Sequence, residues 1–101
     1  MAATAQQRLR RFDTIFRYGG EEFLICLPRT TIDEAVASVE RIRTDIAAAT
    51  VVVDGLPDIR ITASFGVAEL RPDAGIEACI EIADQALFIA KATGRNRTCS
   101  L

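Results

Sequence analysis

Two glycines followed by two acidic residues make Gly19-Gly20-Glu21-Glu22 the stretch of this sequence best suited to chemistry. Glycine has no Cβ, so the backbone can approach a ligand closely. Carboxylate oxygens are the ligands that Mg²⁺ prefers, and the metal is usually held by one or two carboxylates together with substrate phosphates. The stretch could therefore hold a metal–nucleotide complex, although its composition alone favours a solvated hairpin tip with acidic ends.

Two cations near the C-terminus, Lys91 and Arg95, are four residues apart. If the helix that carries Lys91 continues through Gly94, both side chains share one face and can clamp a phosphate, with bidentate contacts from the arginine. The simpler explanation is that cations are favoured at helix C-termini by the helix dipole. The spacing alone favours this simpler explanation.

Arg10 and Asp13 form a third candidate pair, three residues apart and ahead of the glycines. Such a pair can form a plain surface ion pair of little energetic value. An Arg-x-x-Asp string is by itself a weak motif, and its distinguishing feature is that Asp13 lies six residues before Gly19.

The composition limits the chain to one domain and excludes several functions. It has 101 residues, 50% of them hydrophobic, and a net charge of −2, so we expect a packed core and no nucleic-acid polymer as partner. Histidine is absent, which excludes Ser-His-Asp and Cys-His catalysis. Cys26, Cys79 and Cys99 form no CxxC pair, so we expect reduced, mostly buried thiols. With no membrane-spanning run and no visible signal peptide, we expect a cytoplasmic chain without membrane contact.

Local patterns predict a β-hairpin followed by a well-defined helix. The strands of the hairpin flank the paired glycines and cover Asp13–Tyr18 and Glu22–Leu27. Thr31 and Glu34 then form a capping box, which begins a helix that should end near Ala48. Apolar residues at helical spacing define its buried face: Ile32, Ala35, Val36, Val39, Ile42 and Ile46.

The remaining patterns predict two or three further strands and a second long helix. The elements are an edge strand at Val51–Val53, an alternating strand at Ile59–Leu70, a helix at Ile76–Thr93 with Gly94 at its C-cap, and a last strand within Arg97–Leu101. The inner face of this helix is predicted from Ile76, Cys79, Ile80, Ala83, Leu87 and Ala90. With an initial helical segment at Ala2–Arg11, the order predicts an α+β fold, an α/β sandwich with helices packed on a mainly antiparallel sheet.

The hairpin tip carries the signature of a known family. The heptapeptide Arg17–Phe23, Arg-Tyr-Gly-Gly-Glu-Glu-Phe, resembles the signature of GGDEF domains in its Glu-for-Asp variant. Other segments follow in the order typical of the family: Phe23–Pro28, Glu40–Arg43, Ile61–Ala68, Ala83–Leu87 and Ala90–Asn96. The resemblance covers the chain after about Arg8, and it matches the larger, C-terminal part of a GGDEF domain.

This resemblance implies a nucleotide-cyclase or ferredoxin-like fold and diguanylate cyclase activity. In such domains two copies face each other, and the 3′-hydroxyl of each bound GTP attacks the α-phosphate of the other, which yields cyclic di-GMP and pyrophosphate. The metal, Mg²⁺ with Mn²⁺ as the alternative, lowers the cost of the developing charge. By resemblance, Glu21 and Glu22 are the catalytic and metal-binding residues, with Glu21 the candidate base. The nucleotide-binding positions are Gly19, Gly20, Lys91 and Arg95.

The resemblance also assigns a role to the Arg-x-x-Asp pair. Its spacing from the glycines matches the family's inhibitory site, where the product binds and stops the enzyme. Arginine there recognises guanine edges and phosphate, and aspartate accepts hydrogen bonds from guanine N–H groups. Arg41 matches a supporting arginine, so we predict a cyclic di-GMP site at Arg10, Asp13 and Arg41.

The segment that begins the family pattern is missing from this sequence. It holds an apolar strand with an Asp-x-Asp-like stretch and a Phe-Lys-x-x-Asn-Asp string, which supply a second metal ligand, a phosphate-binding lysine and the groups that read guanine. We therefore expect residues 1–101 to be a single truncated domain that lacks the first strand, with negligible cyclase activity alone, or a fragment of a longer protein. Unpaired edges at Phe23–Leu27 and Ile59–Val67 predict a homodimer or higher oligomer.

Three functions remain open on this basis. The chain is a truncated diguanylate cyclase domain, a receptor that senses cyclic di-GMP without making it, or a structural remnant that only dimerises. The intact signature at Gly19–Phe23 favours an active ancestor, whereas the missing strand favours the second or third function for this polypeptide.

Overall fold

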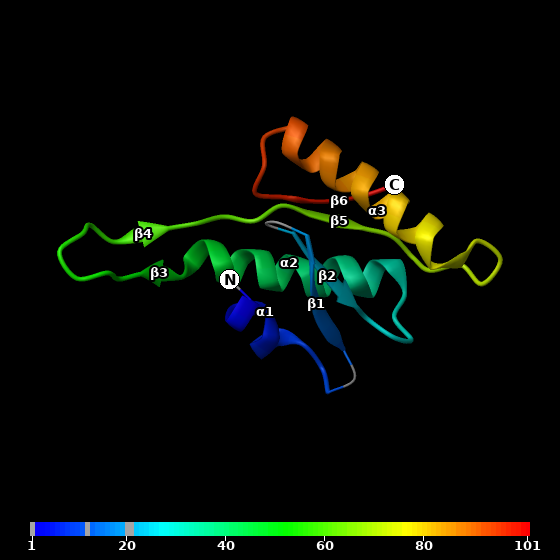
Figure 1. Ribbon diagram of the computed structural model, residues 1–101, viewed down its shortest axis with the longest axis horizontal. Coiled ribbons are helices and arrows are strands. Elements are labelled where there is room, and N and C mark those ends of the chain that lie inside the picture. The colour runs from blue at the N-terminus through cyan, green and yellow to red at the C-terminus, as the bar shows by residue number, and fades with distance from the viewer. Residues whose placement is uncertain (1, 12, 20–21) are drawn as a thin grey trace.

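The computed structural model describes residues 2–11, 13–19 and 22–101. Its elements are α1 (Ala2–Arg8), β1 (Thr14–Gly19), β2 (Glu22–Cys26), α2 (Ile32–Ala48), β3 (Thr50–Val51), β4 (Ile59–Arg60), β5 (Phe65–Val67), α3 (Gly75–Ala92) and β6 (Thr98–Ser100). The strands form two-stranded ladders, of which β1–β2 and β3–β4 are antiparallel and β5–β6 is parallel. The mixed helix and strand class agrees with the prediction, but the described strands do not join into one sheet (Figure 1).

Helix α2 is the central element, and its local sequence explains where it begins. Thr31 Oγ1 accepts the backbone N–H of Glu34 at 3.2 Å, and the Glu34 carboxylate accepts the backbone N–H of Thr31 at 3.1 Å. The predicted capping box is therefore present. The helix ends at Ala48, as predicted, and its buried residues all belong to the predicted inner face: Ala35, Val39, Ile42 and Ile46.

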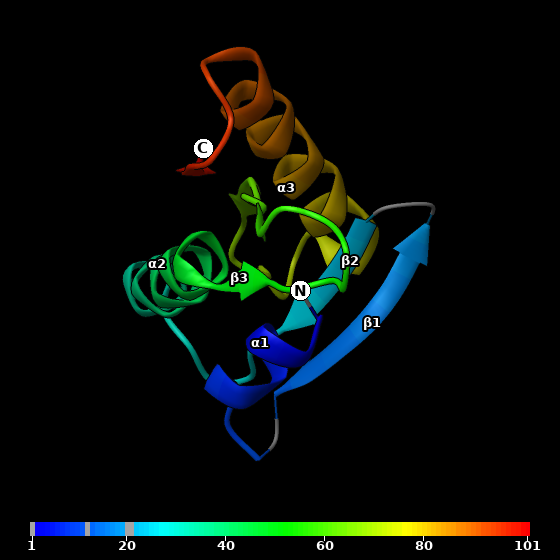
Figure 2. The same ribbon diagram turned by 90° about the vertical axis from the view of Figure 1, so that its left-hand side faces the viewer.

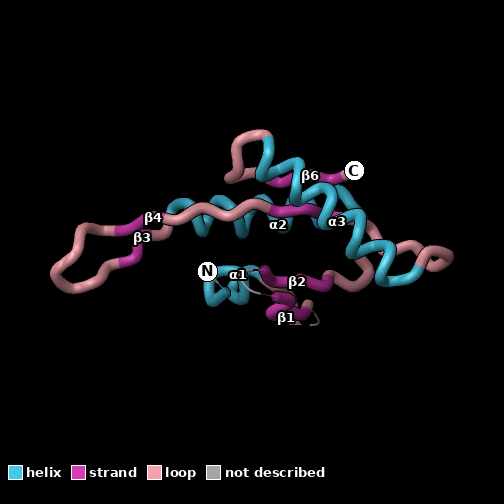
Figure 3. Tube along the Cα trace, turned by 45° about the horizontal axis from the view of Figure 1, so that its top comes forward, coloured by secondary structure: helices cyan, strands magenta, loops and turns pink. Residues whose placement is uncertain are grey.

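The core consists of two apolar clusters along α2. One joins Ile42 and Ile46 to Ala5 of α1, and the other joins Ala35 and Val39 to Val67 of β5. Strands β5 and β6 lie between α2 and α3 (Figure 1). Helix α1 and the β1–β2 hairpin lie together in Figure 3, and Ile15 and Ile25 of the hairpin pack against the same α2 cluster as Phe65 of β5. The β3–β4 arm extends from one end of this arrangement, so the longest dimension reaches 53 Å.

Strand β5 approaches α3 closely at Gly66. A Cβ at this position would lie 2.0 Å from the carbonyl oxygen of Ala83 and 2.4 Å from the backbone nitrogen of Leu87. Glycine permits this contact between backbones because it has no side chain. The packed face of α3 is centred on the fully buried Ala86 and Ala90.

The predicted inner face of α3 needs two corrections, one residue to add and one to remove. Ala86 is missing from the prediction although it is fully buried, and Ile76 was included although it is 57% exposed. The physical reason is the short distance between β5 and the helix at Gly66, which selects small side chains for the contact.

The predicted strand at Ile59–Leu70 is wrong in its length. Only β4 and β5 form ladders within it. The alternation correctly predicts which side chains face the core, because Ile61, Ala63 and Phe65 pack against the cluster around Ile42. A ladder also needs a hydrogen-bonded neighbour, and among the described residues this stretch gains one where β4 meets β3 and another where β5 meets β6.

Two local predictions are also corrected. Helix α1 ends at Arg8 instead of Arg11, which leaves Arg10 in the turn before β1. Cys26 is exposed, because Ile25 faces the core and successive residues of a strand point to opposite faces; Cys79 and Cys99 are half-buried. No helix in the described ranges has the length and apolar character needed to cross a membrane.

Candidate functional site

The β1–β2 hairpin presents the first residue of its second strand toward α3. Its register pairs Gly19 with Glu22, with an irregularity between Arg17 and Gly19. The predicted hairpin is therefore confirmed, whereas Gly20 and Glu21 lie outside the described residues. Figure 2 shows the same end of the hairpin beside α3.

Glu22 lines a shallow hollow between the hairpin and α3. The hollow has a volume of about 210 Å³ and is lined by Glu22, Asp84, Leu87, Phe88 and Lys91. Three of these residues, Leu87, Phe88 and Lys91, follow Asp84 on α3 by three, four and seven positions. All four therefore lie on one face of the helix. Tertiary structure thus brings a carboxylate of the hairpin together with the lysine that was predicted to bind phosphate.

The hollow combines two carboxylates, one ammonium group and two apolar side chains. Carboxylate oxygens suit Mg²⁺, which commonly completes its coordination with substrate phosphates. Lysine supplies a compact positive charge for a phosphate group. The donor set of Glu22, Asp84 and Lys91 therefore fits a magnesium–phosphate group. Within the described ranges, no three acidic or cysteine side chains form a cluster that could hold a metal.

Asp84 is a site residue that the sequence analysis does not predict. Its segment, Ala83–Leu87, was recognised only as part of the family pattern. The seven-residue spacing between Asp84 and Lys91 places both on one helix face, and this periodicity could have identified it. The proximity of both residues to Glu22 depends on the packing of the hairpin beside α3.

Arg95 does not share a helix face with Lys91. Helix α3 ends at Ala92, and the backbone N–H of Arg95 donates to the carbonyl of Ala90 at 2.9 Å. Gly94 has φ +131°, which together with this hydrogen bond is typical of a Schellman turn. The helix therefore does not continue through Gly94, and Arg95 lies exposed on a separate turn outside the lining of the hollow.

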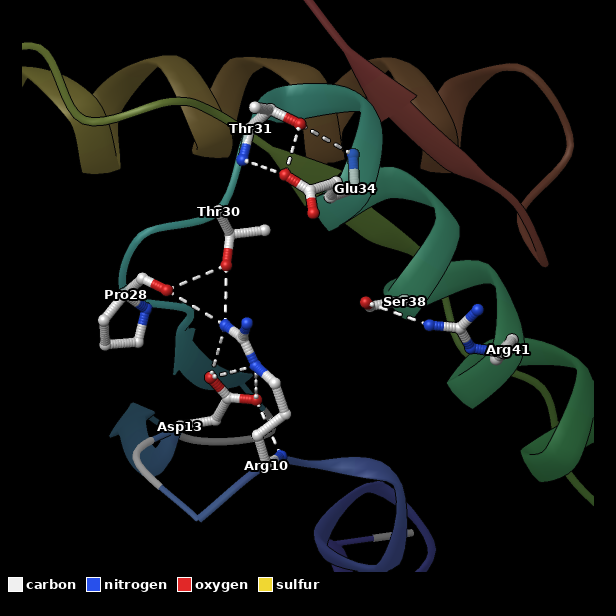
Figure 4. Close-up of polar contacts among 8 residues, drawn as sticks. All are labelled: Arg10, Asp13, Pro28, Thr30, Thr31, Glu34, Ser38 and Arg41. Atoms are coloured by element: carbon white, nitrogen blue, oxygen red, sulfur yellow. Dashed lines mark hydrogen bonds and ion pairs between the residues drawn. The ribbon is translucent and has the colours of Figure 1, made fainter.

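Arg10 and Asp13 form the other predicted pair, in the turn between α1 and β1. Arg10 Nη2 lies 3.0 Å from Asp13 Oδ1, and the backbone N–H of Arg10 donates to Asp13 Oδ2 at 2.7 Å. The same guanidinium group donates to the carbonyl of Pro28 at 3.0 Å and to the hydroxyl of Thr30 at 2.6 Å (Figure 4). Arg10 therefore fastens the turn before β1 to the connection between β2 and α2.

The hydrogen bonds of this pair shift its titration. The Arg10 side chain lowers the pKa of Asp13, and Asp13 in turn raises the pKa of Arg10. The Asp13 side chain is 3% exposed, whereas the Arg10 side chain is 46% exposed. The site is thus an ionised, covered carboxylate with an accessible cation beside it.

Arg41 is not brought to this pair. It lies on α2, where its Nη2 donates to Ser38 Oγ of the same helix at 3.3 Å. Figure 4 shows Arg41 apart from Arg10 and Asp13. Of the three residues of the predicted cyclic di-GMP site, the structure therefore joins two.

Comparisons with known proteins relate nearly the whole chain to one family. The family model described as the diguanylate cyclase GGDEF domain matches residues 1–97. Diguanylate cyclase DgcM of Escherichia coli is 42% identical over 97 residues, which cover 96% of this chain and 23% of DgcM. The chain therefore spans less than a quarter of this relative.

Solved structures show the same fold. Diguanylate cyclase SiaD of Pseudomonas aeruginosa, in complex with its activator SiaC, has a TM-score of 0.92 and 36% identity over 99% of this chain and 38% of SiaD. The GGDEF domain of DgcB from Caulobacter crescentus, in complex with c-di-GMP, has a TM-score of 0.91 and 31% identity over 98% of this chain and 59% of that chain. These similarities confirm the predicted mixed fold.

Proposed function

Because this chain belongs to the GGDEF domain family of diguanylate cyclases, we propose that it forms the metal- and phosphate-binding side of a site that condenses two GTP molecules into cyclic di-GMP. The observation that supports this proposal is the hollow in which Glu22 of the hairpin meets Lys91 of α3. The two groups come from distant parts of the sequence, and both match positions that the family resemblance assigns to metal and phosphate.

The roles of the residues follow from their chemistry. Lys91 would bind the phosphates of GTP, and Glu22 and Asp84 are the residues that would hold the metal. By the family resemblance, Glu21 is the candidate base, and Gly19 and Gly20 are nucleotide-binding positions; Gly20 and Glu21 fall outside the described residues. Mg²⁺, or Mn²⁺, supplies charge stabilisation when bound. Since GTP is an intracellular substrate, we expect the chain to work in the cytoplasm.

A binding and turnover experiment tests this proposal. We expect the chain to bind GTP with Mg²⁺ and Lys91→Ala to weaken this binding about tenfold or more, because a charge-assisted phosphate contact is lost. Arg71→Ala removes the same charge from an exposed loop and should bind as the unmodified chain does. Equal weakening by both variants would contradict a specific role of Lys91.

We expect no turnover of GTP by the purified chain alone. The segment to which the family resemblance assigns guanine recognition and a second metal ligand is not among residues 1–101. Chromatography of a reaction with GTP and Mg²⁺ would measure the product. Formation of cyclic di-GMP would show that the chain is catalytically complete.

A cyclic di-GMP receptor is the second candidate function, and the Arg10–Asp13 pair favours it. The guanidinium group is accessible and is already oriented by Asp13 and Thr30. The similar GGDEF domain of DgcB has been solved in complex with c-di-GMP. A ligand at this site would exchange the contacts of Arg10 with Pro28 and Thr30 for contacts with guanine or phosphate.

Calorimetric titration with cyclic di-GMP separates this receptor from a structural remnant. We expect binding by the unmodified chain and loss of binding in Arg10→Ala, with Arg71→Ala as the charge-matched control. Thermal unfolding of each variant checks that the fold is kept, because Arg10 also fastens two turns together. Absence of binding by the unmodified chain would exclude the receptor function.

A further inference from the structure

The turn after α3 has an uncommon backbone conformation. Gly94 has φ +131°, Arg95 has φ +62° and Asn96 has φ +48°, so three successive residues lie in the region of positive φ. Glycine adopts such angles readily, but arginine and asparagine do so at a cost unless the surroundings hold them there. The turn also carries Arg95, the second cation that was assigned to phosphate.

Arg43 of α2 forms two hydrogen bonds with Asn96 of this turn. Its Nη1 donates to the side-chain oxygen of Asn96 at 2.8 Å and to the backbone carbonyl of Asn96 at 3.2 Å. Glu40, one turn earlier on α2, accepts from Arg43 Nε at 2.8 Å and forms an ion pair with Arg43 Nη2 at 2.7 Å. The Arg43 side chain is 19% exposed, so its guanidinium group is oriented at both ends and largely covered.

Ser64, just before β5, and Phe65, the first residue of β5, also form hydrogen bonds with this turn. The backbone N–H of Asn96 donates to Ser64 Oγ at 3.1 Å, and the carbonyl of Arg97 accepts the N–H of Phe65 at 2.9 Å. Asn96 is therefore fixed through its N–H, its carbonyl and its side chain. By contrast, the side chain of Arg95, the residue before Asn96, is exposed.

We infer that Arg43 is a positioning residue for phosphate binding: by clamping Asn96, it fixes the turn that carries Arg95, the second cation assigned to phosphate. This inference rests on the proposed function, because it concerns the same phosphate group. Arg43 itself does not touch the phosphate. It links α2 to the end of α3, which are distant in sequence, and it acts through the backbone of the residue next to Arg95.

A double-mutant cycle with inorganic pyrophosphate and Mg²⁺ as the probe tests the inference. We expect Arg95→Ala and Arg43→Ala each to weaken pyrophosphate binding, Arg43→Ala by about tenfold, and Arg43→Ala to cause little further loss once Arg95 is absent. A merely structural role would lower the unfolding temperature and weaken binding equally in both backgrounds. Arg71→Ala removes the same charge from an exposed loop and should leave binding unchanged.

The outcomes separate this inference from the proposed function. No pyrophosphate binding by the unmodified chain would overturn both. Binding that Lys91→Ala and Arg95→Ala lose but Arg43→Ala keeps, or an equal effect of Arg43→Ala with and without Arg95, would overturn only the role of Arg43. If Arg43→Ala does not fold, Asn96→Ala removes the side-chain acceptor from the turn, and the same cycle with Arg95→Ala decides between these outcomes.

Discussion

At the scale of single residues, the Arg10–Asp13 pair makes stability depend on pH. The pKa of Asp13 is lowered in the folded chain, chiefly by the hydrogen bond from the Arg10 side chain. A carboxyl group with a lowered folded pKa stabilises the fold above its unfolded pKa, which is about 4 for aspartate, and this contribution is lost as the pH falls through the folded pKa. The loss therefore belongs to the range below about pH 4.

Thermal unfolding between neutral and acidic pH measures this contribution. We expect Asp13→Asn to unfold at a lower temperature than the unmodified chain at pH 7, because the ion pair with Arg10 is gone. The difference should shrink toward acidic pH, where Asp13 is protonated as well. Asp73→Asn, in the exposed loop before α3, serves as the control and should follow the unmodified chain throughout. A difference that stays constant at all pH values would contradict the assignment.

At the scale of elements, the contact between β5 and α3 depends on Gly66. An added methyl group would overlap the helix backbone at Ala83 and Leu87, which cannot move as a flexible side chain can. We expect Gly66→Ala to lower the free energy of unfolding by about 1–3 kcal/mol, the range typical of overpacked cores. Denaturant titration measures the change.

Gly19 offers a matched control for this substitution. A Cβ at Gly19 meets no described atom within 4 Å, so Gly19→Ala should leave the free energy of unfolding nearly unchanged. If both alanine variants are equally stable, the close approach between β5 and α3 does not limit the fold.

At the scale of the whole molecule, the hairpin leaves an apolar face uncovered. Phe16 is 50% exposed and Tyr18 is 52% exposed on the face that also carries Cys26, and β2 pairs with β1 alone among the described strands. Apolar faces and unpaired strand edges favour association between chains. We therefore expect a homodimer or a higher oligomer in solution.

Light scattering coupled to size-exclusion chromatography tests this expectation. Phe16→Lys should shift the chain toward the monomer, because it places a charge on the outer face of the hairpin. Val52→Lys introduces the same charge at a side chain that is 72% exposed near the β3–β4 arm, and it should not change the mass. A monomeric mass for the unmodified chain would contradict the prediction.

Features that depend on neighbours along the chain could be predicted from the sequence. The capping box at Thr31, the hairpin around the paired glycines and the buried face of α2 are all predicted correctly, because a few adjacent residues satisfy the hydrogen bonds or set the periodicity. The family signature is local in the same sense, and the comparisons confirm the family that it indicates.

Which of the candidate residues meet depends on how the elements pack together. Sequence spacing favoured Lys91 with Arg95, but the helix ends before Arg95, and Lys91 instead shares a hollow with Glu22 and Asp84. Likewise, the ladders that form within Ile59–Leu70 depend on a neighbouring strand. The physical reason is that packing and ladder hydrogen bonds join residues distant in sequence, so neither spacing nor alternation along one segment specifies its partner.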